Sequence, residues 1–115
     1  MSVALALLAA SAAVSVDLGA VMDRLETCVM AKTDFLAPAN EPANVTVEAA
    51  LAACLTERAN FRTATKQFLG ASSPSLSAHA ASEVEQKTYD LGISSVRDRA
   101  LVRLVTARAI SAGNK

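Results

Sequence analysis

The fold is decided by residues 28–54, which read CVMAKTDFLAPANEPANVTVEAALAAC, with a cysteine at each end and a proline-bearing turn in the middle. Pro38 and Pro42 cannot lie in a helix interior, and the neighbouring Asn40 and Asn44 favour turns. Both cysteines are about eight residues from this turn, which is roughly 12 Å along a helix axis. The stretch therefore predicts two antiparallel helices, over residues 17–36 and 46–69, with the cysteines level with each other.

Apolar spacing places both cysteines on the buried sides of these helices. The apolar positions recur at i, i+3, i+4 and i+7, which is typical of one helix face. They are Leu18, Val21, Leu25, Cys28 and Phe35 in the first helix, and Val47, Leu51, Cys54, Phe61 and Phe68 in the second. We therefore predict a Cys28–Cys54 disulfide. The alternative is a pair of free cysteines buried as small apolar side chains.

Composition favours an all-α protein with a single domain. The 115 residues include only 3% aromatic side chains, four glycines and three prolines, and they show no convincing run of alternating polar and apolar residues. A core of alanine, leucine and valine suits close helix packing better than a sheet. After the hairpin we expect a long third helix over residues 75–111, so that residues 17–115 form the domain.

The third helix carries apolar side chains on two sides. Because such a helix needs two partners, the hairpin can cover one side, and a second subunit or the N-terminal segment the other. Gly92 and the following serine pair predict a bend. The first set is Leu76, Ala80, Val84, Leu91, Val102, Val105 and Ala109, and the second, our candidate self-association face, is Tyr89, Ile93, Val96, Ala100 and Leu104.

The N-terminal segment, residues 1–16, contains no charged side chain and ends in small residues. A short apolar run followed by small residues resembles a secretory signal peptide, although no lysine or arginine precedes the run. The run is shorter than the roughly 20 residues that a membrane-spanning helix needs. We expect a cleaved signal, and the alternatives are an uncleaved anchor or an apolar helix packed in the protein or in an assembly.

Charge is segregated along the chain, although the formal net charge is zero. Residues 17–57 carry seven acidic and two basic side chains, a net charge of −5, whereas residues 58–115 carry nine basic and four acidic ones, a net charge of +5. We expect the acidic hairpin to lie beside the basic third helix. The alternative is a basic surface for an anionic partner such as a lipid surface, formed by Arg97, Arg99, Arg103 and Arg108. Nucleic acid is not expected, because no aromatic residues are interleaved with these arginines.

The sequence carries no recognisable catalytic or metal-binding pattern. His79 is the only histidine, and a cluster of His79 with Cys28 and Cys54 lacks the ligand spacing of zinc sites. The sequence has no glycine-rich phosphate loop and no nucleophile elbow. We therefore predict no catalytic residue, no metal and no cofactor.

These observations predict a non-enzymatic periplasmic or secreted protein that works by binding proteins or by self-association. An alternative is a structural subunit of a larger assembly that retains residues 1–16. The general plan resembles small periplasmic helical proteins, including acid-stress chaperones, and this resemblance implies a chaperone-like binding protein as a further alternative. No motif matches, so no functional residue is carried over.

Overall fold

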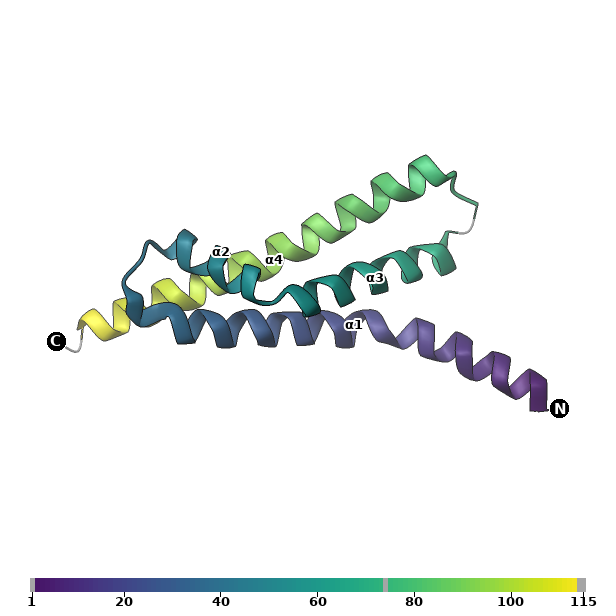
Figure 1. Cartoon of the computed structure of the whole chain (residues 1–115), viewed down its shortest axis with the longest axis horizontal. Coiled ribbons are helices and arrows are strands. Elements are labelled where there is room, and N and C mark those ends of the chain that lie inside the picture. The colour runs from purple at the N-terminus through teal and green to yellow at the C-terminus, as the bar shows by residue number, and fades with distance from the viewer. Residues whose placement is uncertain (1, 74, 114–115) are drawn as a thin grey trace.

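The computed structural model describes residues 2–73 and 75–113, with side chains from residue 18 onward, and this part of the chain contains helices and no strand (Figure 1). The elements are α1 (Ser2–Leu36), the 3-10 helix η1 (Ala37–Ala39), α2 (Ala43–Ala53), α3 (Leu55–Ser72) and α4 (Ala78–Gly113). The predicted all-α class is confirmed. Helix α1 runs without a break through most of the predicted signal segment, whose side chains lie outside the described residues. Its cleavage stays a prediction.

The turn between α1 and α2 forms where the prolines predict it. Pro38 lies at the start of η1, and Asn40 ends this short helix in the left-handed conformation, with φ of 58°. Pro42 then precedes α2 and its carbonyl accepts a hydrogen bond from the backbone N–H of Thr46 at 3.1 Å. The predicted start at residue 46 is therefore three residues late.

The predicted second helix is divided in two at Cys54. This residue has φ −103° and ψ 44°, so α2 ends before it and α3 begins after it. The backbone N–H of Cys54 donates to the Leu51 carbonyl at 3.2 Å, and the Arg58 side chain donates to the same oxygen at 3.4 Å. These bonds occupy a carbonyl that the break would leave without its usual helical partner.

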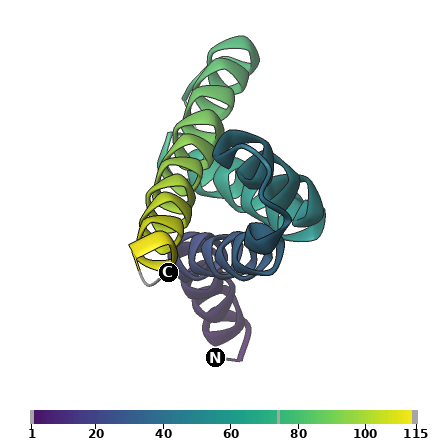
Figure 2. The same ribbon diagram turned by 90° about the vertical axis from the view of Figure 1, so that its left-hand side faces the viewer.

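The core lies between three rods, namely α1, the α2–α3 pair and α4, which occupy the corners of a triangle in the end-on view (Figure 2). Each rod supplies a buried stripe at helical spacing. The core residues include Val21, Leu25 and Val29 of α1, Val47 and Leu51 of α2, Phe61 of α3, and Ile93, Val96, Ala100 and Leu104 of α4. The central residues of the two predicted apolar stripes of the hairpin are buried, as expected. Phe35 and Phe68, at the stripe ends, are exposed.

Gly92 allows α3 and α4 to approach closely, and it does not break α4, which is continuous. A Cβ atom added at Gly92 would lie 2.4 Å from Cζ of the buried Phe61 ring and 2.7 Å from Cε1. The Phe61 ring also packs against Tyr89, with 5.7 Å between the ring centroids. The Phe61 ring therefore leaves no room for a side chain at residue 92.

Gly92→Ala should therefore lower stability although alanine is the better helix former. Displacing a buried ring costs about 1–3 kcal/mol, against a gain of about 1 kcal/mol in helix propensity. Gly70→Ala in α3 is the matched control, because nothing lies within 4 Å of a Cβ there. Urea unfolding should show a loss for the first variant and a slight gain for the second. Equal gains for both would contradict the close approach.

Candidate functional site

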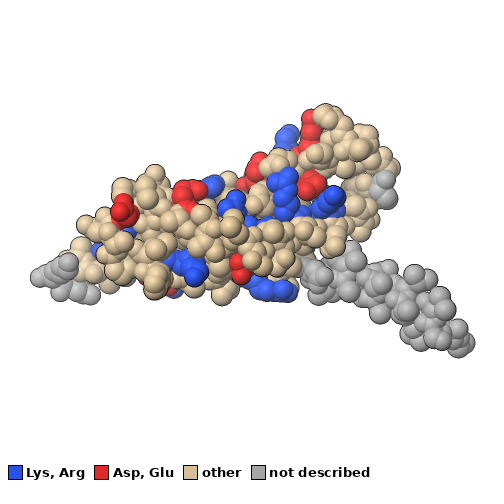
Figure 3. Space-filling view, in the orientation of Figure 1, with Lys and Arg blue, Asp and Glu red and all other residues tan. Residues whose placement is uncertain are grey.

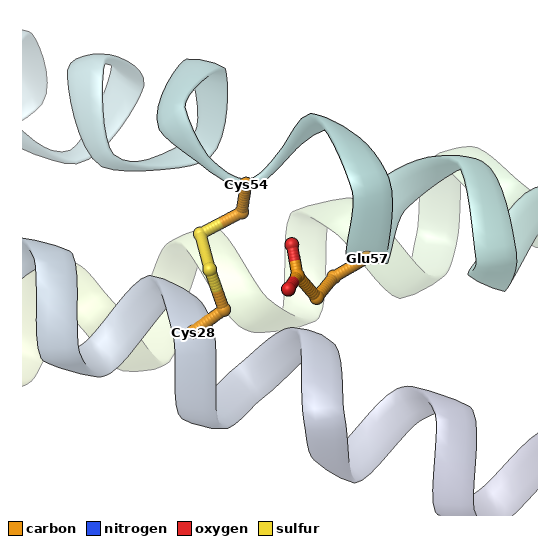
Figure 4. Close-up of side chains that lie close together, drawn as sticks. All are labelled: Cys28, Cys54 and Glu57. Atoms are coloured by element: carbon orange, nitrogen blue, oxygen red, sulfur yellow. A yellow bond between two sulfur atoms is a disulfide. The ribbon is translucent and has the colours of Figure 1, made fainter.

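The Cys28–Cys54 disulfide links the C-terminal part of α1 to the junction between α2 and α3 (Figure 4). The two Cα atoms are 6.1 Å apart, and the residues are 26 positions apart in the sequence. Cys54 is fully buried, whereas Cys28 is half-buried. The predicted disulfide is confirmed, and no free cysteine remains in the chain. A bond of this kind persists in oxidising compartments.

Glu57, which the sequence analysis did not single out, lies beside the disulfide with its carboxylate turned toward the sulfurs (Figure 4). One ligand atom each from Cys28, Cys54 and Glu57 lies within 4.8 Å of the others, and in the described part of the chain this is the only such group of three metal-ligating side chains. A pocket of about 440 Å³ opens next to it, between α1 and α3. The sequence spacing could have indicated this neighbour, because Glu57 follows Cys54 by three residues, which is about one helical turn.

His79 is not part of this cluster. It lies in the first turns of α4, exposed, with Nε2 3.1 Å from Oε1 of Glu83. The hypothetical cluster of His79 with the two cysteines is therefore not formed in the structure. The i,i+4 arrangement with Glu83 is an ordinary helix-surface pair.

The four arginines of the candidate anionic contact are all engaged within the chain. On one side of α4, Arg99 bonds Glu26 at 2.7 Å, and Arg103 bonds both carboxylate oxygens of Asp34 at 2.9 and 2.7 Å. On the other side, Arg97 bonds Glu48 at 2.5 Å. Arg108 donates to the backbone carbonyls of Glu41 at 2.7 Å and Ala37 at 3.2 Å.

These contacts show how the segregated charges are used. Two arginines reach α1, and the other two reach the turn and α2, so α4 is fixed between the two halves of the hairpin. Basic and acidic side chains accordingly lie close together on the face shown in Figure 3. The expectation that the acidic hairpin lies beside the basic helix is confirmed. Arg97, Arg99, Arg103 and Arg108 each have a partner within the chain, and their contact with an anionic partner stays a prediction.

Asp34 should make stability depend on pH in the acid range. The hydrogen bond from Arg103 holds the pKa of the Asp34 carboxyl below its usual value of 3.8. Because the folded pKa is below the unfolded one, the pair stabilises the fold above about pH 4, and this contribution is lost as pH falls through the folded value. Asp34→Asn should thus lower Tm slightly at pH 7, and the difference from the wild type should shrink as pH falls below about 4. Asp23→Asn, an exposed acid of the same helix, is the control; a difference that does not shrink would contradict the assignment.

The predicted self-association face is part of the chain's own core. Ile93, Val96, Ala100 and Leu104 are each at most 6% exposed, and Tyr89 is half-buried under two α3 arginines. The guanidinium of Arg62 lies 4.9 Å from the Tyr89 ring centroid, and Nε of Arg58 donates to the Tyr89 hydroxyl at 3.3 Å. The prediction that these five residues face a second copy is therefore wrong, since α1, α2 and α3 cover them.

The opposite side of α4 is the exposed apolar one. We call it the outer stripe, and its members are Val84, Leu91, Val102 and Val105. Leu91 is 72% exposed and Val102 67%, both far above the values of the core side. The two apolar sets of the third helix thus exchange the roles expected from the sequence: the hairpin covers the Ile93 set, and the outer stripe has no partner within the described residues.

Comparison with protein-family models, with curated proteins and with solved structures finds no match to this chain. Among the described helices, none combines the length and the hydropathy required to cross a membrane. What the chain does must therefore be inferred from its own surface, the disulfide and the outer stripe.

Proposed function

We propose that this chain is an exported, non-enzymatic helical protein that acts by self-association, through the outer stripe of α4. The observation that carries the proposal is the exposure of Leu91 and Val102 on the side of α4 opposite the core. Apolar side chains that recur at helical spacing on one exposed side of a helix are found at sites that bind another protein. The disulfide supports export, because such bonds are rare in reducing compartments.

A second copy of the chain is the occupant that the charges around the stripe favour. Lys87 and Asp98 lie on the same edge of the stripe, and both are exposed. In an antiparallel pair of α4 helices centred between Gly92 and Ile93, Lys87 of each copy is level with Asp98 of the other. The same register places Val84 beside Val102 of the second copy. A two-fold arrangement therefore repeats both contacts, as a self-complementary interface requires.

Apolar contact would supply most of the affinity, and the charges would set direction and register. Exposed ion pairs contribute only about 0–1 kcal/mol each. Charges at the rim of an interface act more strongly on orientation and on rejection of wrong alignments. A parallel pair, in contrast, would keep Lys87 and Asp98 of the two copies 11 positions apart along the helix axis, so the two opposite charges would not meet.

Sedimentation over a range of concentrations tests the proposal. The chain should form a dimer, and Leu91→Glu should give a monomer with an unchanged far-UV circular dichroism spectrum. Leu55→Glu is the matched control, because Leu55 is equally exposed, at 66%, but lies on α3. Lys87→Asp should weaken the dimer, and adding Asp98→Lys to it should restore association. A wild-type chain that stays monomeric at all concentrations would refute self-association.

Export is tested on the natural protein by mass spectrometry. A mature N-terminus near residues 13–17, with a mass two hydrogens below that of the dithiol form, would support it. An intact Met1 with free thiols would refute export and would favour the alternative of an internal subunit of an assembly.

A further inference from the structure

Cys28, Cys54 and Glu57 form a cluster whose use is not explained by the disulfide alone. Their three ligand atoms lie within 4.8 Å of one another, and they come from two rods of the fold, α1 and the start of α3. In Figure 4 the Glu57 carboxylate points toward the sulfurs and not along the surface of its own helix. Two thiols and a carboxylate are a ligand set that suits Zn²⁺ once the thiols are free.

The backbone is already spaced for a metal. In a tetrahedral zinc site with Zn–S bonds of about 2.3 Å, two sulfurs lie about 3.8 Å apart. Cα atoms 6.1 Å apart leave room for this separation through rotation of the cysteine side chains. Cys54 has a non-helical backbone directly before α3, and Glu57 lies in the first turn of that helix. Both can therefore turn toward the same point, opposite Cys28 of α1.

The pocket beside the cluster gives a metal ion access to the three ligands and leaves room for a fourth ligand. The pocket of about 440 Å³ is lined by Cys28 and Glu57 together with Thr27, Asn60 and Arg24. An ion can enter from this side, and a water molecule can complete the tetrahedron. The charge of Arg24 acts against a cation in the same pocket, so its removal should strengthen binding.

We propose that the reduced chain binds one Zn²⁺ through Cys28, Cys54 and Glu57, so that the metal and the disulfide exclude each other. A dithiol reduces the disulfide by transferring two electrons and two protons, and is itself oxidised to a disulfide. Zinc then binds the two sulfurs as thiolates and releases their two protons. A chain that has not yet been oxidised requires no reductant. Zinc at this site protects the pair from oxidation. When a disulfide oxidant takes two electrons from the two thiolates and is itself reduced to two thiols, the Cys28–Cys54 disulfide forms and the metal is released.

The test uses full-length chain reduced with a phosphine and then titrated with zinc chloride alone. Zinc should slow the reaction of both thiols with a chromogenic disulfide and raise the Tm of the reduced chain, since a ligand of the folded state stabilises it. Cobalt in place of zinc should give the absorption of a tetrahedral thiolate complex. If the reduced chain is partly unfolded, zinc should restore its helical circular dichroism. Zinc should leave the Tm of the oxidised chain unchanged.

Variants separate the three-ligand site from simple binding of metal by cysteines. Glu57→Gln should weaken zinc binding by more than about tenfold. Loss of a residue that only hydrogen-bonds to a metal ligand already costs about that much, and loss of a ligand should cost more. Glu41→Gln, at an exposed acid in the turn, is the control and should bind as the wild type does. Arg24→Gln should bind more tightly. The proposal is overturned if zinc neither protects the thiols nor raises Tm, or if Glu57→Gln binds as the wild type does.

Discussion

Removal of the Cys28–Cys54 disulfide should lower the free energy of unfolding by about 3.5 kcal/mol, the value that the chain-entropy model gives for a closed loop of this length. The loop spans 26 residues and contains the turn and the whole of α2. Without the bond, the unfolded chain gains freedom over this segment, whereas the folded rods keep their apolar contacts. For a domain of about 100 residues the loss corresponds to a decrease in Tm of roughly 14–28 °C.

Thermal unfolding with and without a phosphine reductant measures this effect in zinc-free buffer. The double variant Cys28→Ala with Cys54→Ala should unfold near the midpoint of the reduced wild type, and the reductant should not change it further. Both cysteines are replaced because a single remaining thiol could form a disulfide between two molecules. A wild-type midpoint that is insensitive to the reductant would show that the two sulfurs are not bonded in solution.

Leu104→Ala should destabilise the fold by about 2–5 kcal/mol, because it leaves a cavity in a packed core. Leu104 is 1% exposed and faces the hairpin from between the two arginine pairs of α4. Leu55→Ala makes the same chemical change at a side chain that is 66% exposed, and it should alter stability by less than about 0.5 kcal/mol.

Urea unfolding of the two leucine variants compares these sites directly. Leu104→Glu should go further and abolish cooperative unfolding, because it buries a carboxylate without a partner. A folded, monomeric Leu104→Glu protein would instead support the original prediction that this side of α4 meets a second copy. Equal stabilities of Leu104→Ala and Leu55→Ala would contradict the assignment of Leu104 to the core.

The hairpin could be predicted from the sequence because simple geometry fixes it. Prolines at 38 and 42 locate the turn, and a constant rise per residue then places Cys28 and Cys54 level with each other. The division at Cys54 could not be predicted, since no glycine or proline marks it. It depends on the Leu51 carbonyl finding a donor in Arg58, a contact that only the folded structure shows.

The buried side of α4 was assigned wrongly, although the sequence held the information. The two apolar sets of this helix are similar in size, so hydrophobic spacing alone does not separate them. The arginines do, because the Ile93 set lies between the pair Arg99 and Arg103 and the pair Arg97 and Arg108. An acidic hairpin attracts both pairs, and the side of α4 between them must then face it.

The anchoring of α4 has a consequence for how the molecule opens. Its hydrogen bonds to α1, η1 and α2 are made by Arg97, Arg99, Arg103 and Arg108, whereas its earlier turns reach only α3 among the described residues, through Glu85, Gln86 and Tyr89. The first half of the helix can thus detach in a local fluctuation while the second half stays fixed. Amide protons over residues 82–88 should accordingly exchange with deuterium well before those over residues 96–104, making α4 two units of unequal lifetime within one continuous rod.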